Sequence, residues 1–129
     1  MREPGIPDDV RRFVLTSVPS VPFMEAMLVF RARHGERLTT RNIGEWLYMS
    51  EEAAAGFVAQ LVASRIIRPA ETDRASHRFA PESDELAEML DRVASCYSSN
   101  LIEMTDLIHA KTERKARHFA DAFRLRKDP

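Results

Sequence analysis

Cysteine, net charge and long apolar runs are all scarce in this chain of 129 residues. Its one cysteine, Cys96, has no second cysteine to pair with, so the fold cannot depend on an internal disulfide or on an oxidising compartment. No apolar run approaches the roughly 18 residues that a membrane-spanning helix needs, and the N-terminal stretch lacks the apolar run of a signal peptide. These absences predict a cytoplasmic protein of bacterial type with no membrane partner.

Net charge is almost absent. The 19 basic and 20 acidic side chains nearly cancel, which leaves a formal net charge of -1 and a pI near 6.4. A protein held on nucleic acid by bulk attraction carries a clear excess of positive charge. Any affinity for DNA must therefore come from local groups of basic residues.

Catalytic motifs are also missing. The sequence has no phosphate-binding loop, dinucleotide fingerprint, nucleophile elbow or cysteine-rich metal pattern. Glu103, Asp106 and His109 recur at steps of three, which drift around a helix, so we interpret them as a charged solvent edge and not as a metal site. Cys96 is interpreted as a small core residue. We predict a non-enzymatic protein with no catalytic residue, cofactor or metal.

Two helices are predicted in the N-terminal part of the chain. Residues 1–7 hold two prolines and a glycine and are expected to form a loose arm. Acidic residues suit the helix start at Asp8, and the helix should end near Val18, just before a proline. Ser20 can cap a second, strongly apolar helix that ends at Gly35. The link that follows, residues 36–38, can supply one or two residues of a strand.

A pair of helices joined by a tight turn is predicted next. Thr39 or Thr40 caps the first, with its apolar positions at Ile43, Trp46 and Leu47, where the tryptophan is expected in the core. Ser50 caps the second, which runs to about residue 64. Its apolar residues at helical spacing are Ala54, Phe57, Val58, Leu61 and Val62. If these point inward, the outward positions are Glu51, Glu52, Ala53, Ala55, Gly56, Ala59 and Gln60.

A two-stranded hairpin and a long helix are predicted for the rest of the chain. The short extended runs at residues 65–71 and 77–81 flank a polar turn without glycine. Ser83 then caps the longest helix, whose apolar seam continues for about six turns. The seam consists of Leu86, Leu90, Val93, Tyr97, Leu101, Met104 and Ile108. It can pack within the chain or pair with a second copy, and the sequence leaves both open.

The order of these elements resembles the winged helix-turn-helix superfamily, in particular the MarR-like branch of small bacterial transcription regulators. Ile43, Gly44 and Leu47 match the pattern of the supporting helix, and Ser50 matches the serine that ends the turn. The likeness covers roughly residues 21–81. It implies a mainly α-helical fold with a small β-hairpin: a winged helix-turn-helix domain with N-terminal helices and a long C-terminal helix.

The step into the wing also fits the resemblance, with one departure. Ile66 and Ile67 form the usual apolar pair and Arg68 the basic residue after it. Arg65 stands where the family usually has glycine, because the chain there takes a left-handed turn. The predicted organisation is an N-terminal arm and short helix (1–19), a winged domain (20–82), and a long helix followed by a basic terminal helix (83–129), the last region serving dimerisation.

DNA contacts are implied by the resemblance, although base-reading residues are few. In this docking mode the start of the second helix approaches base edges, and among its outward residues only Gln60 belongs to the strong readers. Glu51 and Glu52 repel phosphate, and acid at a helix start is explained by the helix dipole. The basic and imidazole side chains expected near phosphate are Arg37 and Arg41 near the start of the supporting helix and Arg74, His77 and Arg78 around the wing.

The sequence therefore favours a dimeric, DNA-binding transcriptional regulator with weak base-reading chemistry. The alternative is a non-catalytic protein–protein interaction module on the same scaffold, which needs no base readers. A homodimer is expected because closed twofold assemblies are the commonest.

Overall fold

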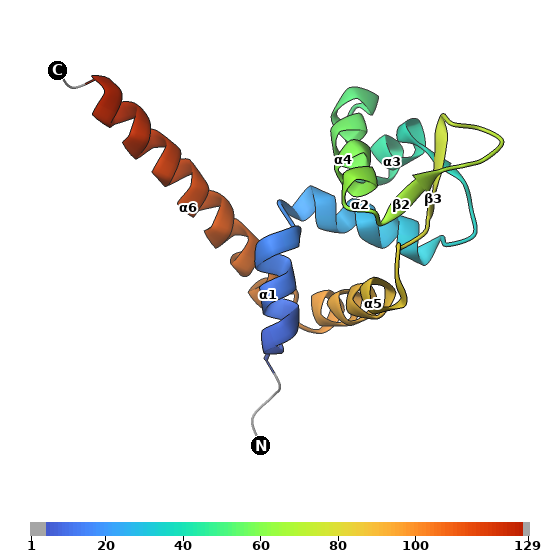
Figure 1. The fold of residues 1–129 in the computed structure, drawn as a ribbon, viewed down its shortest axis with the longest axis horizontal. Coiled ribbons are helices and arrows are strands. Elements are labelled where there is room, and N and C mark those ends of the chain that lie inside the picture. Colours follow the sequence, from blue (N-terminus) through green and yellow to red (C-terminus); the bar gives the residue numbers. More distant parts are fainter. Residues whose placement is uncertain (1–4, 128–129) are drawn as a thin grey trace.

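The computed structural model describes residues 5–127 (Figure 1). Its helices are α1 (Asp8–Ser17), α2 (Val21–Ala32), α3 (Thr40–Leu47), α4 (Glu51–Ala63), α5 (Asp84–Ser99) and α6 (Leu101–Lys127), and its strands are β1 (Leu38–Thr39), β2 (Ile67–Pro69) and β3 (Ser76–Phe79). The chain is mainly helical with a small antiparallel sheet, which confirms the coarse fold prediction.

Side-chain caps start the helices where the sequence predicts them. The hydroxyls of Ser20, Ser50 and Ser83 each accept the backbone N–H three residues further on, at 3.1 to 3.2 Å. Thr39 and Asn42 form a reciprocal capping box at the start of α3. Each cap satisfies N–H groups that have no partner inside the helix, which is why local sequence alone locates these boundaries.

The sheet has three strands in the order β1-β3-β2. β2 and β3 form the predicted hairpin, with Ile67 opposite Phe79 and Arg68 opposite Arg78. The link before α3 supplies a third strand, in which Leu38 lies opposite His77. The sheet thereby ties the start of α3 to the hairpin.

One hydrophobic core joins the three predicted regions. It contains Val10 and Val14 of α1, Phe23, Met27 and Phe30 of α2, Leu61 of α4, Leu90 and Val93 of α5, and Met104 and Ile108 of α6. The helix pair, the sheet and the C-terminal helices are therefore held by shared packing. Beyond this core α6 continues, and Figure 1 shows its C-terminal part projecting away from the rest of the chain.

The prediction of one uninterrupted seam helix is wrong. α5 ends at Ser99 and α6 begins at Leu101, with Asn100 at φ -131° and ψ 52° between them. Asparagine favours such breaks because its side chain competes with helical hydrogen bonds. The break lets α5 and α6 both contact α1, and it leaves Leu101 50% exposed, outside the seam.

The remaining seam residues lie within the chain's own core. Leu90, Val93, Met104 and Ile108 are buried, and Leu86 and Tyr97 are half-buried against the same core. The structure thus answers the question that the periodicity left open, because these side chains pack inside one chain.

Between residues 5 and 127, no single helix is both long and apolar enough to cross a bilayer. α1 and α2 meet that criterion only when taken together, and they are bent by 109° relative to each other.

Candidate functional site

A tight turn joins α3 to α4 and depends on Gly44. A Cβ atom at Gly44 would lie 2.8 Å from the carbonyl oxygen of Met49 and 3.4 Å from that of Ser50. The Met49 N–H donates to the Gly44 carbonyl at 2.9 Å, and Tyr48 takes a left-handed conformation with φ 55°. Only glycine lets the start of α4 approach α3 this closely.

The outer face of α4 is exposed as the sequence predicts. Ala54, Val58 and Leu61 are buried and Phe57 is half-buried. The exposed residues, which we call the α4 outer face, are Glu51, Glu52, Ala53, Ala55, Gly56, Ala59 and Gln60. This surface is acidic at its N-terminal end and built of small residues beyond it.

Arg65 takes the left-handed conformation expected after α4. Its φ is 61°, and its backbone carbonyl accepts the Glu82 N–H at 3.1 Å. The Arg65 guanidinium also pairs with the Glu82 carboxylate at 3.0 Å. An ion pair this exposed contributes little stability. The backbone hydrogen bond with Glu82, and not the ion pair, therefore accounts for a non-glycine residue in this conformation.

Three arginines lie side by side across the outer face of the sheet. Arg68 lies opposite Arg78, and since Leu38 lies opposite His77, the preceding residue Arg37 continues the row beyond Arg78. All three arginines are exposed. Directly opposite residues in antiparallel strands project to the same face, and like charges there are destabilising, by up to about 1 kcal/mol per pair. We call Arg37, Arg68 and Arg78 the arginine row.

Arg68 was not predicted as a site residue from sequence. The hairpin register places Arg68 opposite Arg78. That register depends on the whole sheet, so the sequence alone does not reveal the pairing. Among the side chains that the structure describes, no member of the arginine row forms an ion pair with a carboxylate.

A shallow hollow of about 310 Å³ lies at one end of the arginine row. Arg37 and Arg78 line it together with Glu71 and Thr72. The Arg37 guanidinium donates to the Thr72 hydroxyl, which anchors that side chain at the rim. The hollow thus brings two cations, one hydroxyl and one carboxylate together.

The tip of the hairpin is formed without glycine. The Asp73 carboxylate accepts the Ala75 N–H at 3.0 Å, and the Asp73 carbonyl accepts the Ser76 N–H at 3.1 Å. Aspartate commonly makes such turns by bonding the backbone two residues on. Arg74 is exposed within this turn, and Arg41 is exposed in the first turn of α3.

His77 does not join the arginines around it. Neighbouring residues on a strand project to opposite faces, so His77 lies on the face of Leu38, away from Arg78. Its Nδ1 is buried without a hydrogen-bond partner among the described residues, and burial lowers the pKa of His77 below its usual value of 6.5. The structure therefore separates His77 from the basic cluster in which the sequence grouped it.

Stability should depend on pH through His77. Because its folded pKa is lowered, the unfolded chain binds a proton that the folded chain does not as the pH falls below about 6.5. The contribution of His77 to the free energy of unfolding is fully present above that pH. It is lost as the pH falls toward the lowered pKa of the folded state. We expect the urea midpoint to fall between about pH 7 and pH 5, and His77→Gln to remove part of that fall.

His109→Gln, at an exposed position on α6, is the matched control for a histidine-to-glutamine change away from the sheet. Parallel midpoint profiles for the wild type and His77→Gln would contradict the assignment.

The tryptophan expected in the core is on the surface. Trp46 is 49% exposed, and the Arg33 guanidinium lies 4.3 Å from the centre of its ring. Tyr48, two residues on, is 97% exposed. Ile43 and Gly44 already fill the buried side of this two-turn helix, which leaves Trp46 at the edge of α3.

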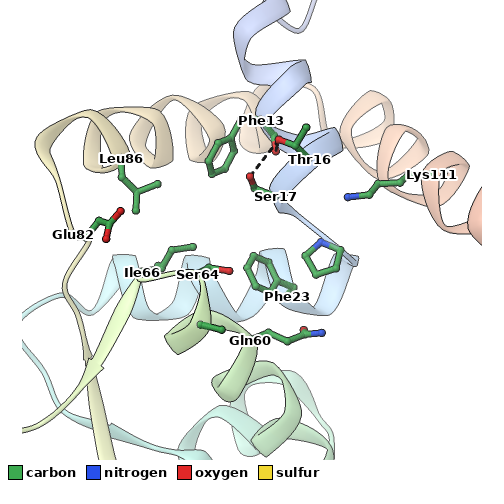
Figure 2. A pocket seen from close by; sticks show the side chains of 12 residues that line it. Phe13, Thr16, Ser17, Phe23, Gln60, Ser64, Ile66, Glu82, Leu86 and Lys111 are labelled. Carbon is green, nitrogen blue, oxygen red and sulfur yellow. Dashed lines mark hydrogen bonds between the residues drawn. The ribbon is translucent and has the colours of Figure 1, made fainter.

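A second and larger cavity, about 530 Å³, lies where α1, α2, the end of α4 and α6 meet (Figure 2). Phe13 and Phe23 give it aromatic walls, and Glu82 and Lys111 lie on opposite sides of it. The Lys111 ammonium donates to the Val18 carbonyl at 3.2 Å. Within the described part of the chain, no three His, Cys, Asp or Glu side chains come together in a way that could hold a metal ion.

Comparison with protein-family models, with curated proteins and with solved structures finds no match to this chain.

Proposed function

We propose that this chain is a DNA-binding transcriptional regulator on a winged helix-turn-helix scaffold. α3 and α4 are the helix-turn-helix pair, and the β2–β3 hairpin is the wing. The observation that carries the proposal is an outward-facing helix, entered by a tight turn and followed directly by a hairpin rich in arginine. That combination offers a protruding surface with local positive charge. The chain as a whole has a net charge near zero, so only such a local surface can attract DNA.

Contacts through this surface would fix the position of the protein on DNA but would discriminate little between base sequences. Arg37, Arg41, Arg74 and Arg78 are exposed and suited to phosphate oxygens, which carry no base information. On the α4 outer face only Gln60 is a strong base reader. We therefore expect a small ratio between specific and non-specific affinity, below the thousandfold or so that marks well-specified sites.

The proposed regulator acts as a homodimer through α1 and α6. These helices contact each other and carry exposed apolar side chains: Leu15 is 37% exposed, Leu101 50% and Ile102 75%. A second copy related by a twofold axis would cover the same residues on both chains at once. Two wings per particle would also double the number of phosphate contacts.

Fluorescence anisotropy with a labelled duplex from the protein's own promoter region, and a mixed-sequence duplex of equal length, tests the proposal. Four phosphate contacts per protomer, and therefore eight per dimer, predict a loss of about ten-thousandfold in affinity between 50 and 200 mM salt. Light scattering on the protein without DNA should give twice the 14.7 kDa chain mass. Absence of binding to both duplexes at 50 mM salt would refute DNA binding, and a 14.7 kDa particle at micromolar concentration would refute the dimer.

A protein–protein interaction module is the second candidate, and one observation favours it. Trp46, Tyr48 and Arg33 are of the residue types that dominate binding energy at protein interfaces, and both aromatic side chains are exposed, Trp46 on α3 and Tyr48 in the turn that follows it. Such a module would use small residues of the α4 outer face for close contact. It predicts no duplex binding in the titration above.

A further inference from the structure

We infer that DNA lies against the outer face of the three-stranded sheet, held by the arginine row, and that the α4 outer face does not enter a groove. This inference rests on the proposed DNA binding and specifies the surface and orientation. It differs from a helix-led mode, in which α4 would make the principal contacts.

The spacing of the arginine row suits a phosphate backbone. Neighbouring strands lie about 4.8 Å apart, so the row from Arg68 through Arg78 to Arg37 spans about 10 Å. Consecutive phosphates of one DNA strand rise about 3.4 Å along the helix axis but also turn around it, so they lie further apart than that rise, and the row can reach about two neighbouring phosphates. Guanidinium groups bind phosphate oxygens through two parallel N–H donors, so each arginine can hold one phosphate.

The electrostatics of the row also indicate an anionic partner. Arg68 and Arg78 face each other as like charges, and no described carboxylate pairs with any of the three arginines. A bound phosphate would convert that repulsion into attraction. Glu71 in the adjoining hollow weakens the site at one end, whereas the bond from Arg37 to Thr72 orders the guanidinium there before any ligand arrives.

The α4 outer face has the opposite character. Its first turn presents two exposed carboxylates, Glu51 and Glu52, to any ligand that approaches the helix N-terminus. Beyond them Ala55, Gly56 and Ala59 supply no hydrogen-bond donor from a side chain. A polyanion is therefore repelled at one end of α4 and gains little at the other, while the sheet face offers three cations in a line.

Anisotropy titrations of the full-length chain against the mixed-sequence duplex, at 50 to 200 mM salt, test this surface. Arg68→Ala combined with Arg78→Ala should weaken binding by at least about tenfold and reduce the salt slope by about two per protomer, or about four for the dimer. Arg11→Ala combined with Arg12→Ala removes the same charge from the exposed side of α1 and, with the dimer shown by light scattering to be retained, should change affinity by less than about threefold. Arg68→Lys combined with Arg78→Lys should keep the salt slope.

A neutral block of α4 completes the test. Ala55→Gln combined with Ala59→Gln adds bulk to the α4 outer face without charge and should change affinity by less than about threefold if that face makes no close contact. Circular dichroism of every variant checks that the fold is retained.

These outcomes distinguish failure of the sheet-face inference from failure of DNA binding itself. Wild-type binding that survives the Arg68/Arg78 double substitution, or that is lost in the α4 block or equally in the Arg11/Arg12 control, overturns the sheet-face inference and leaves DNA binding intact. Failure of the wild type to bind overturns both. A tenfold preference for an RNA duplex of the same sequence overturns the assignment to DNA.

Discussion

Gly44→Ala is expected to destabilise the protein by about 3 kcal/mol, which corresponds to a fall in Tm of roughly 10 °C. The added methyl carbon would lie 2.8 Å from the Met49 carbonyl oxygen, closer than van der Waals contact allows. The obstacle is backbone in the turn between α3 and α4, which cannot swing aside as a long side chain can. Thermal unfolding followed by circular dichroism measures the effect.

Gly56→Ala provides a control of opposite sign. Gly56 lies inside α4 with no atom within 4 Å of its missing Cβ. Alanine there reduces the entropy that the unfolded chain loses on folding and should stabilise by about 0.5 to 1 kcal/mol. Equal Tm values for the two variants would show that the close approach at Gly44 does not exist in solution.

Met104→Ala is expected to cost about 2 to 5 kcal/mol of unfolding free energy. Met104 is fully buried in the core that α6 shares with α1 and α2, so the substitution removes apolar contacts and leaves a cavity. Urea denaturation monitored by circular dichroism, at several protein concentrations, measures this loss. The change in free energy should not depend on concentration, because the contacts are within one chain.

Leu101→Ala is the matched comparison from the same predicted seam. Leu101 is 50% exposed, so its truncation should cost less than about 1 kcal/mol in the folded protomer. If Leu101→Ala costs as much as Met104→Ala and that cost does not depend on protein concentration, the break at Asn100 is absent in solution and the seam helix continues as periodicity suggested.

Local chemistry accounts for what could be predicted. The caps at Ser20, Thr39, Ser50 and Ser83, and the acidic first turn of α4, are signals contained within four residues of the chain. The buried and exposed sides of α4 also follow from spacing, because a helix repeats every 3.6 residues. For the candidate site, this was enough to predict the α4 outer face and the exposure of Arg74 and Arg78.

Non-local packing accounts for what could not be predicted. Helical periodicity alone extends the seam through Leu101. In the structure the helix breaks at Asn100, and the break lets α6 pack against the core that it shares with α1 and α2. Trp46 fits an apolar spacing, yet no element covers that edge of α3. His77 and Arg78 are adjacent in sequence and were grouped together, whereas strand geometry sends them to opposite faces.

By itself the amino-acid sequence determined where α1 to α5 begin and which side of α4 is apolar. These are properties of hydrogen bonds and contacts between residues a few positions apart. Only the tertiary structure decided that β1 joins the hairpin and so aligns Arg37, Arg78 and Arg68, which are separated by up to 41 positions along the chain. A ladder between distant strands fixes that alignment, and its register depends on the packing of the whole sheet against the helices.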